Sequence, residues 1–261
     1  MTGFGRDLKV IVATSAVILI TAFLWRALYE FGDVSLVSLI PLSILMLTGS
    51  YITILGSRRA SLDSILSEST SVRHWLKGRI VAAVLSLIVT AVGIFLLAYK
   101  ALVAQSWELL VSVLCVLTTS VFFLKASRMA SPHVNQKYLL TAATNMTVVT
   151  AGTLFFFVYI YSLWNFQKYP EYILSDSLLV SIERALSELP QGIGPAAGLF
   201  EIAAVIEISK SWLVVKSESL FGFAPAIYIV YGALFGYFQV RAVASVVCSL
   251  IMILNGYKLR V

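Results

Sequence analysis

Arg241 is the ionisable residue that lies deepest inside a long apolar stretch of this chain. If that stretch crosses a bilayer, the charge is costly there and by default indicates a functional role. Its guanidinium could attract an anionic group such as a lipid phosphate. The alternative is an arginine whose long stem carries the charge back to the headgroups, with no role in binding.

Three further residues in apolar stretches could form contacts between helices. Gly232 and Gly236 have the G-x-x-x-G spacing, which removes side chains from one helix face and lets another backbone approach closely. Asn145 belongs to an Asn-Met-Thr glycosylation sequon, but it lies within an apolar run and is expected to form a hydrogen bond across helices instead. These residues indicate helix packing or a substrate path.

Known catalytic patterns are absent from the sequence. There is no G-x-x-x-x-G-K-[ST] phosphate loop, no H-E-x-x-H zinc motif and no pair of carboxylates within the expected spans. His74 and His133 fall in basic loops, and Cys115 and Cys248 show no C-x-x-C spacing. We therefore expect no catalytic residue, no metal and no cofactor on this chain.

The elements that must position these residues are helices in a lipid bilayer. Of the 261 residues, 59% are hydrophobic and 12% are charged, against roughly half and a quarter in an ordinary soluble domain. The net charge of +6 resides in short Lys and Arg clusters between apolar runs, so it does not indicate nucleic acid. The sequence predicts an all-α integral membrane protein with a single domain over residues 1–261.

Five spans are expected from apolar runs long enough to cross a bilayer core of about 30 Å. They lie at 8–28, 35–55, 80–104, 109–124 and 138–164. Residues 222–257 form one further apolar stretch, which as a single helix would reach about 50 Å. We expect six spans, with residues 222–236 against the outer leaflet before the last crossing. A tight hairpin at Arg241 would instead give seven.

The orientation follows from the basic clusters, because Lys and Arg gather in cytoplasmic loops. With the N-terminus inside, 12 basic and three acidic residues face the cytoplasm, whereas six basic and ten acidic residues face outside. We therefore expect a multi-pass protein of the cell membrane with both termini in the cytoplasm.

Two polar segments interrupt the spans. Residues 57–79 lie on the cytoplasmic side, and Leu62, Ile65 and Leu66 fall on one helical face there. That helix could rest on the inner leaflet or contact a cytoplasmic partner. Residues 165–221 lie outside, with amphipathic helices expected at 173–189 and 199–215 and a Pro- and Gly-rich break between them. They are typical of a lid or a re-entrant pair.

This layout resembles the permease subunit of an ABC-2-type exporter. The local sequence is similar to the family's pattern at RRASLDSILS (58–67), at Ser71 and at LKGRI (76–80), where a basic residue and a leucine pair precede a Gly-containing entry into the third span. The resemblance in sequence covers about 25 residues, and the rest is topological.

The resemblance implies that residues 60–70 form a coupling helix that docks on a separate ABC ATPase, which would hold the ATP and Mg. The implied coupling residues are Arg58, Arg59, Leu62, Asp63, Ile65, Leu66 and Arg73. It further implies a second copy or paralogue of the permease, and a substrate path between the two. A non-transporting or pore-forming subunit of a membrane complex is the alternative, in which these spans serve only assembly.

Overall fold

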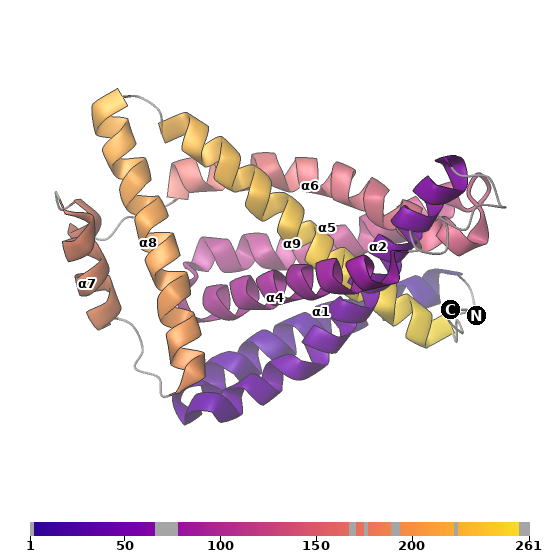
Figure 1. Ribbon diagram of the computed structural model, residues 1–261, viewed down its shortest axis with the longest axis horizontal. Coiled ribbons are helices and arrows are strands. Elements are labelled where there is room, and N and C mark those ends of the chain that lie inside the picture. Colours follow the sequence, from indigo (N-terminus) through magenta and orange to yellow (C-terminus); the bar gives the residue numbers. More distant parts are fainter. Residues whose placement is uncertain are drawn as a thin grey trace.

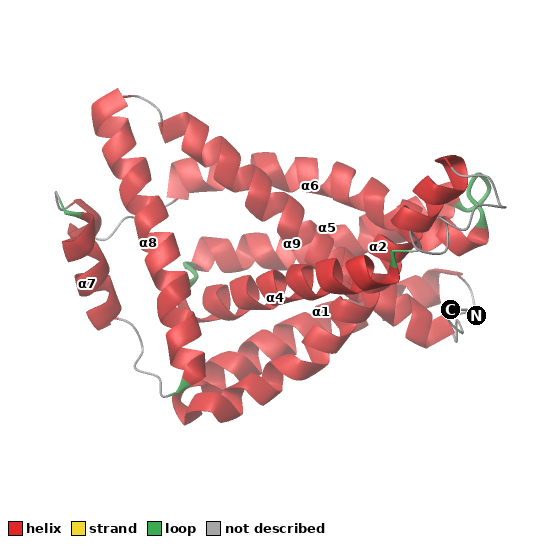
Figure 2. Ribbon diagram, in the orientation of Figure 1, coloured by secondary structure: helices red, strands yellow, loops and turns green. Residues whose placement is uncertain are grey.

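The chain is described by a computed structural model, and the description covers residues 3–65, 78–166, 171–174, 177–188, 194–221 and 224–255. Within these ranges every element is helical and no strand occurs (Figure 2). The expected all-α fold is confirmed.

The long helices follow the apolar runs of the sequence. In chain order the elements are α1 (Gly3–Leu28), η1 (Tyr29–Leu39), α2 (Ile40–Ile65), α4 (Arg79–Val103), α5 (Ser106–Ala130), η2 (Gln136–Tyr138), α6 (Leu139–Phe166), η3 (Glu171–Leu174), α7 (Leu178–Glu188), α8 (Pro195–Phe221) and α9 (Ala224–Asn255).

Five helical stretches of the described chain are long and apolar enough to cross a bilayer. They are Gly5–Leu62, Arg79–Val103, Ser106–Ala130, Gln136–Phe166 and Gly236–Leu254. The first contains both α1 and α2, and the chain reverses between them at Gly32, whose φ of 66° few other residues tolerate. Each of these two helices has 26 residues and is about 39 Å long, enough to span the hydrocarbon core.

The bundle is held together by close helix approaches at small residues. α9 packs mainly on α6 and α2. At the α2–α9 contact, a Cβ on Gly49 would stand 1.9 Å from the backbone oxygen of Ser245. Two hydrogen bonds join the same helices, from Ser50 Oγ to Ser245 Oγ (3.0 Å) and from Ser249 Oγ to the Leu45 carbonyl (2.6 Å). Close contacts at small residues and hydrogen bonds between hydroxyls are typical of helices that associate within a bilayer, where the hydrophobic effect does not drive them together.

α7 and α8 lie at one end of the bundle, which we call the α8 end (Figure 1). α8 runs across the ends of the long helices, and α7 packs on its outer side. α1 begins and α9 finishes at the opposite end, where α2 also ends and α4 begins. An ion pair between Arg128 and Asp7 joins α5 to α1 at that opposite end.

The structure corrects three of the expected boundaries. α2 begins at Ile40 after a 3-10 helix and continues to Ile65, so no separate helix begins at residue 60. α8 is longer than the expected helix at 199–215. α9 is one continuous helix of 32 residues, so residues 224–236 are its first part and no hairpin forms at Arg241. None of these stretches contains a proline that would interrupt the helix at those points.

Candidate functional site

The expected coupling residues are only partly within the described chain. Arg58, Arg59 and Leu62 lie half-buried in the last turns of α2. Asp63 and Ile65 belong to the same helix, but the structure does not describe their side chains. Leu66 and Arg73 lie outside the described residues. The structure therefore places five of the seven residues on α2 and describes the side chains of three of them.

The other expected site residues do not converge on a common site. Gly232 and Gly236 face α6, where a Cβ on Gly236 would stand 3.1 Å from the Phe156 backbone nitrogen. They therefore form a packing contact. Asn145 is exposed on α6 and makes no side-chain hydrogen bond within the described chain, contrary to expectation. Arg241 is half-buried on α9 and has no acidic partner among the described residues.

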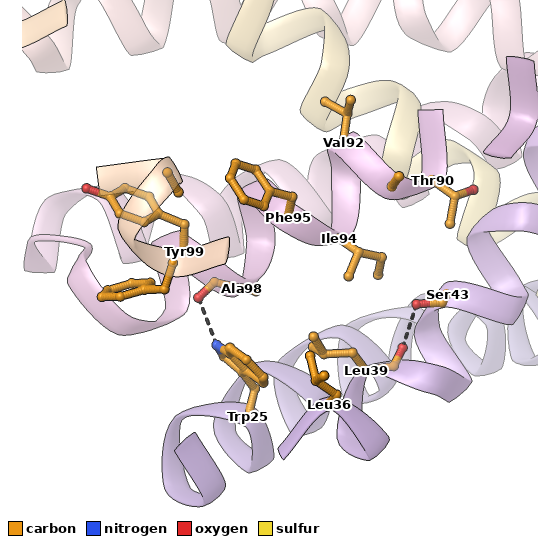
Figure 3. Close-up of a pocket in the computed structure, with 13 residues that line it drawn as sticks. Trp25, Leu36, Leu39, Ser43, Thr90, Val92, Ile94, Phe95, Ala98 and Tyr99 are labelled. Carbon is orange, nitrogen blue, oxygen red and sulfur yellow. Dashed lines mark hydrogen bonds between the residues drawn. The ribbon is translucent and has the colours of Figure 1, made fainter. Parts of the chain in front are cut away.

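An apolar cavity of about 460 Å³ lies beneath α8 (Figure 3). Its walls come from α1, η1, the start of α2, α4 and α8. We call it the α8 pocket, and its lining residues are Trp25, Leu36, Leu39, Ser43, Thr90, Ala91, Val92, Ile94, Phe95, Ala98, Tyr99, Phe200 and Ala203. Its volume lies within the range of small-molecule sites, roughly 300–1,000 Å³.

Aromatic side chains close the pocket at the α8 end. Trp25 stands edge-on to Tyr29, with ring centroids 5.5 Å apart. Phe200 of α8 lies 5.4 Å from the ring of Tyr29 and 5.4 Å from the ring of Tyr99. These ring contacts join α1, η1, α4 and α8, and such offset arrangements are favourable for aromatic pairs. α8 is therefore an integral part of the pocket wall.

The polar atoms of the pocket are nearly all bonded within the protein. Trp25 donates its indole N–H to the Ala98 carbonyl (2.9 Å), and Ser43 donates its hydroxyl to the Leu39 carbonyl (2.8 Å), as Figure 3 shows. The exception is the Thr90 hydroxyl, which is buried and has no hydrogen-bond partner among the described residues. The pocket thus offers carbon surface and one unsatisfied hydroxyl.

Four charged side chains fasten α8 to the bundle beside this pocket. Lys100 at the end of α4 pairs with Glu108 of α5 and lies 3.7 Å from Glu207 of α8 (Nζ to Oε1). Glu207 also pairs with Lys210, one turn along α8. The four side chains are between 9% and 23% exposed. We call Lys100, Glu108, Glu207 and Lys210 the charge cluster; its formal charges cancel, as partly buried ions require.

The local sequence fixes Glu108 in this cluster. It is the third residue of α5 and forms a capping box with Gln105, whose backbone N–H donates to Oε2 at 3.0 Å. Its other oxygen, Oε1, accepts from Lys100 and from the Tyr159 hydroxyl (3.5 Å). One carboxylate therefore caps a helix and also holds the lysine that reaches α8.

Lys210 is the most perturbed ionisable group outside the expected spans. Burial lowers its pKa from 10.5 to about 8, and nearby Lys100 acts in the same direction. The Glu207 carboxylate opposes this shift by favouring the charged form. The lysine is therefore held in place by its carboxylate partner against the cost of leaving water.

The sequence indicated a helix in this region but not the charge cluster. Glu207 and Lys210 were expected on an exposed outer-leaflet surface, whereas the structure buries them against Lys100 and Glu108. Two features of the sequence are consistent with the charge cluster. Glu207 and Lys210 are three residues apart on a helix, and Lys100 and Glu108 flank the tight connection between two spans. The contact between the Glu207–Lys210 pair and the Lys100–Glu108 pair, however, depends on tertiary structure.

Comparisons of the chain with models of protein families, with curated proteins and with solved structures find no match. The functional inference therefore depends on the arrangement of the helices, on the α8 pocket and on the charge cluster.

Proposed function

We propose that this chain is the transmembrane subunit of an ABC exporter, driven by ATP that a separate subunit hydrolyses. It would cross the cell membrane six times, with both termini in the cytoplasm and with a second permease copy or paralogue completing the pathway. ATP and Mg would bind to the partner ATPase.

The observation that carries the proposal is that the α2–α4 helix ends and the α7–α8 pair lie at opposite ends of the bundle. α2 ends and α4 begins at one end, and α7 and α8, inserted between α6 and α9, cover the other (Figure 1). An exporter needs this polarity, because a motor acts on the cytoplasmic end and a gate acts on the outer end.

A single helix connects the two ends. α2 runs without a break from Ile40 to Ile65, and its beginning contributes Ser43 to the α8 pocket. Because α2 is continuous, a translation imposed at its Ile65 end would be transmitted to its Ile40 end. Closure of the ATPase subunits against the segment after Ile65 would therefore alter the pocket beneath α8.

The test is copurification with the P-loop ATPase encoded nearest to this chain. The two proteins should purify together in mild detergent in equimolar amounts, and the complex should hydrolyse ATP. Leu62→Asp should abolish this association by placing a charge in an apolar contact. Ser61→Asp is the matched control, since it adds the same carboxylate to the same turn at an exposed position.

Two results would contradict the proposal. One is that no P-loop ATPase binds the wild-type chain; such a chain would fit a non-transporting subunit instead. The other is that Leu62→Asp and Ser61→Asp bind the ATPase equally well, which would mean that the end of α2 does not contact it.

A further inference from the structure

We propose that the α8 pocket binds the hydrocarbon chain of a membrane lipid. This site goes beyond the transport function proposed above and does not depend on it, because the pocket is formed by this chain alone.

The size of the cavity indicates an occupant. The pocket measures about 460 Å³ and opens to the surface at Ala91 and Val92, so it is large enough and accessible enough to take up a small molecule or part of a chain. Water is a poor candidate to fill it, because a buried water needs two to four polar partners. Thr90 supplies the only unpaired side-chain hydroxyl among the described lining residues. An apolar molecule is the occupant that such walls favour.

The lining also excludes charged and strongly polar ligands. None of the described lining residues is ionisable except Tyr99, whose hydroxyl points away from the pocket in Figure 3. The Trp25 and Ser43 donors are already bonded to backbone carbonyls. A carboxylate, phosphate or ammonium group would enter without a counter-charge, which is prohibitively costly in an apolar site.

The position of the pocket identifies the source of the apolar molecule. α4 is the most apolar of the candidate spans, with a mean hydropathy of 2.9, and only 17% of its apolar window is buried within the chain. Ala91 and Val92 both line the pocket and are exposed on the surface of this helix. The pocket therefore continues to an apolar face that is exposed on this chain, and in a bilayer acyl chains are the abundant apolar molecules at such a face.

The residues at the inner end of the pocket set how far a hydrocarbon chain can enter. Phe200 and Ala203 of α8 are 4% and 5% exposed, so neither is in contact with lipid outside the protein. A hydrocarbon chain that enters past Val92 would end against these two residues, beneath the aromatic contacts of Trp25 and Tyr99. Contact of a lipid with Phe200 thus distinguishes occupancy of the pocket from ordinary surface contact.

The experiment uses the full chain in nanodiscs that contain phosphatidylcholine with a diazirine at the end of one acyl chain. After photolysis, mass spectrometry locates the adducts. We expect adducts on Phe200 and Phe95 in addition to those on exposed residues such as Phe23.

Matched variants of α4 show whether these adducts come from the pocket. Ala98→Phe fills the cavity from its wall and should lower the Phe200 adduct by about tenfold or more, because the ring takes the space of the chain. Ala83→Phe makes the same change at an exposed position of the same helix outside the pocket and should leave the adduct unchanged. If Ala98→Phe does not fold, Ala91→Phe narrows the opening from an exposed position instead.

Two outcomes would overturn the proposal. Labelling of Phe23 without labelling of Phe200 would mean that lipid chains do not enter the pocket. A Phe200 adduct that is lost in Thr90→Val, a change of nearly equal volume, would mean that a hydrogen bond to Thr90 selects the ligand. The hydrocarbon site predicts that Thr90→Val retains the adduct.

Discussion

Glu207→Gln should release α8 from the bundle, because Glu207 is the carboxylate of α8 that faces both lysines of the charge cluster. The change keeps the size of the side chain and removes its charge. Lys210 then loses the carboxylate with which it pairs, and Lys100 loses its contact with α8 while its pair with Glu108 remains. The expected result is a weaker attachment of α8 in a chain that still folds and inserts.

The size of the effect follows from the geometry. Two unit charges 3.7 Å apart, as in the Lys100–Glu207 pair, attract by roughly 4–5 kcal/mol at an effective dielectric constant of about 20. The cost of removing both ions from water offsets much of this attraction. A net loss of about 1.5–3 kcal/mol remains, as is usual for hydrogen bonds to charged groups.

Hydrogen–deuterium exchange of the α8 amides measures this loss as a lower free energy of local opening. A change of about 1.5–3 kcal/mol corresponds to roughly 10- to 150-fold faster exchange. Glu201→Gln is the control, since it makes the same substitution at an exposed position of α8 and should change opening by less than about 0.5 kcal/mol. In the double variant Glu207→Gln/Lys210→Met the loss should be smaller than the sum of the single losses. Equal exchange in Glu207→Gln and Glu201→Gln would refute a role of the cluster in holding α8.

Three further predictions concern pH, packing and topology. The pKa of Lys210 is about 8 with α8 seated and 10.5 in water, so the seated state binds fewer protons. The protection of the α8 amides from exchange should therefore rise from pH 8 to 10 and be lost as pH falls through 8. This pH dependence should be absent in Lys210→Met. A flat profile in the wild-type chain would contradict the burial of this amine. Gly49→Ala should lower the thermal unfolding midpoint, because the added Cβ meets the Ser245 backbone at a cost of roughly 1–3 kcal/mol. The control Gly198→Ala should be near neutral, because no atom lies within 4 Å of its Cβ. Similar midpoints for the two variants would mean that α2 and α9 are farther apart. Cysteines at the exposed positions Ser61 and Ser187 should react with an impermeant maleimide from opposite sides of the membrane, and reaction from the same side would invalidate the orientation.

The long apolar helices could be predicted closely from the sequence. The runs expected at 80–104 and 138–164 correspond to α4 (Arg79–Val103) and α6 (Leu139–Phe166). The thickness of a bilayer sets the length of an apolar run that crosses it. The bounds of such a run therefore predict the bounds of the helix.

The ends of α2 and the course of α9 could not be predicted in this way. After Leu55 the sequence becomes polar, but it contains no residue that must end a helix, so α2 continues to Ile65. A boundary near residue 236 was expected, whereas α9 is one continuous helix from Ala224 to Asn255. The close approach of Gly236 to the Phe156 backbone agrees with the G-x-x-x-G spacing of the sequence. Polarity marks where a helix leaves the membrane, not where it ends.

The candidate site was largely beyond sequence reasoning, because its contacts are non-local. Trp25, Tyr99 and Phe200 are ordinary residues of apolar or amphipathic segments until the fold brings their rings together. The Lys100–Glu207 pair likewise joins two helices that are far apart in the chain. The periodicity of the sequence assigns each residue to a face of its own helix. It does not determine which other helix that face packs against.

The proposed function predicts that ATP-driven movement at the Ile65 end of α2 reaches α8. The most direct test is the distance between spin labels at Ile206→Cys on α8 and Val84→Cys on α4, two exposed positions, measured by pulsed electron paramagnetic resonance. The native Cys115 and Cys248 are fully buried and should not be labelled. In the complex with its ATPase, trapping with ATP and vanadate should shift the distance distribution by several ångströms relative to the nucleotide-free state. Identical distributions in both states, with the ATPase turning over, would contradict the account.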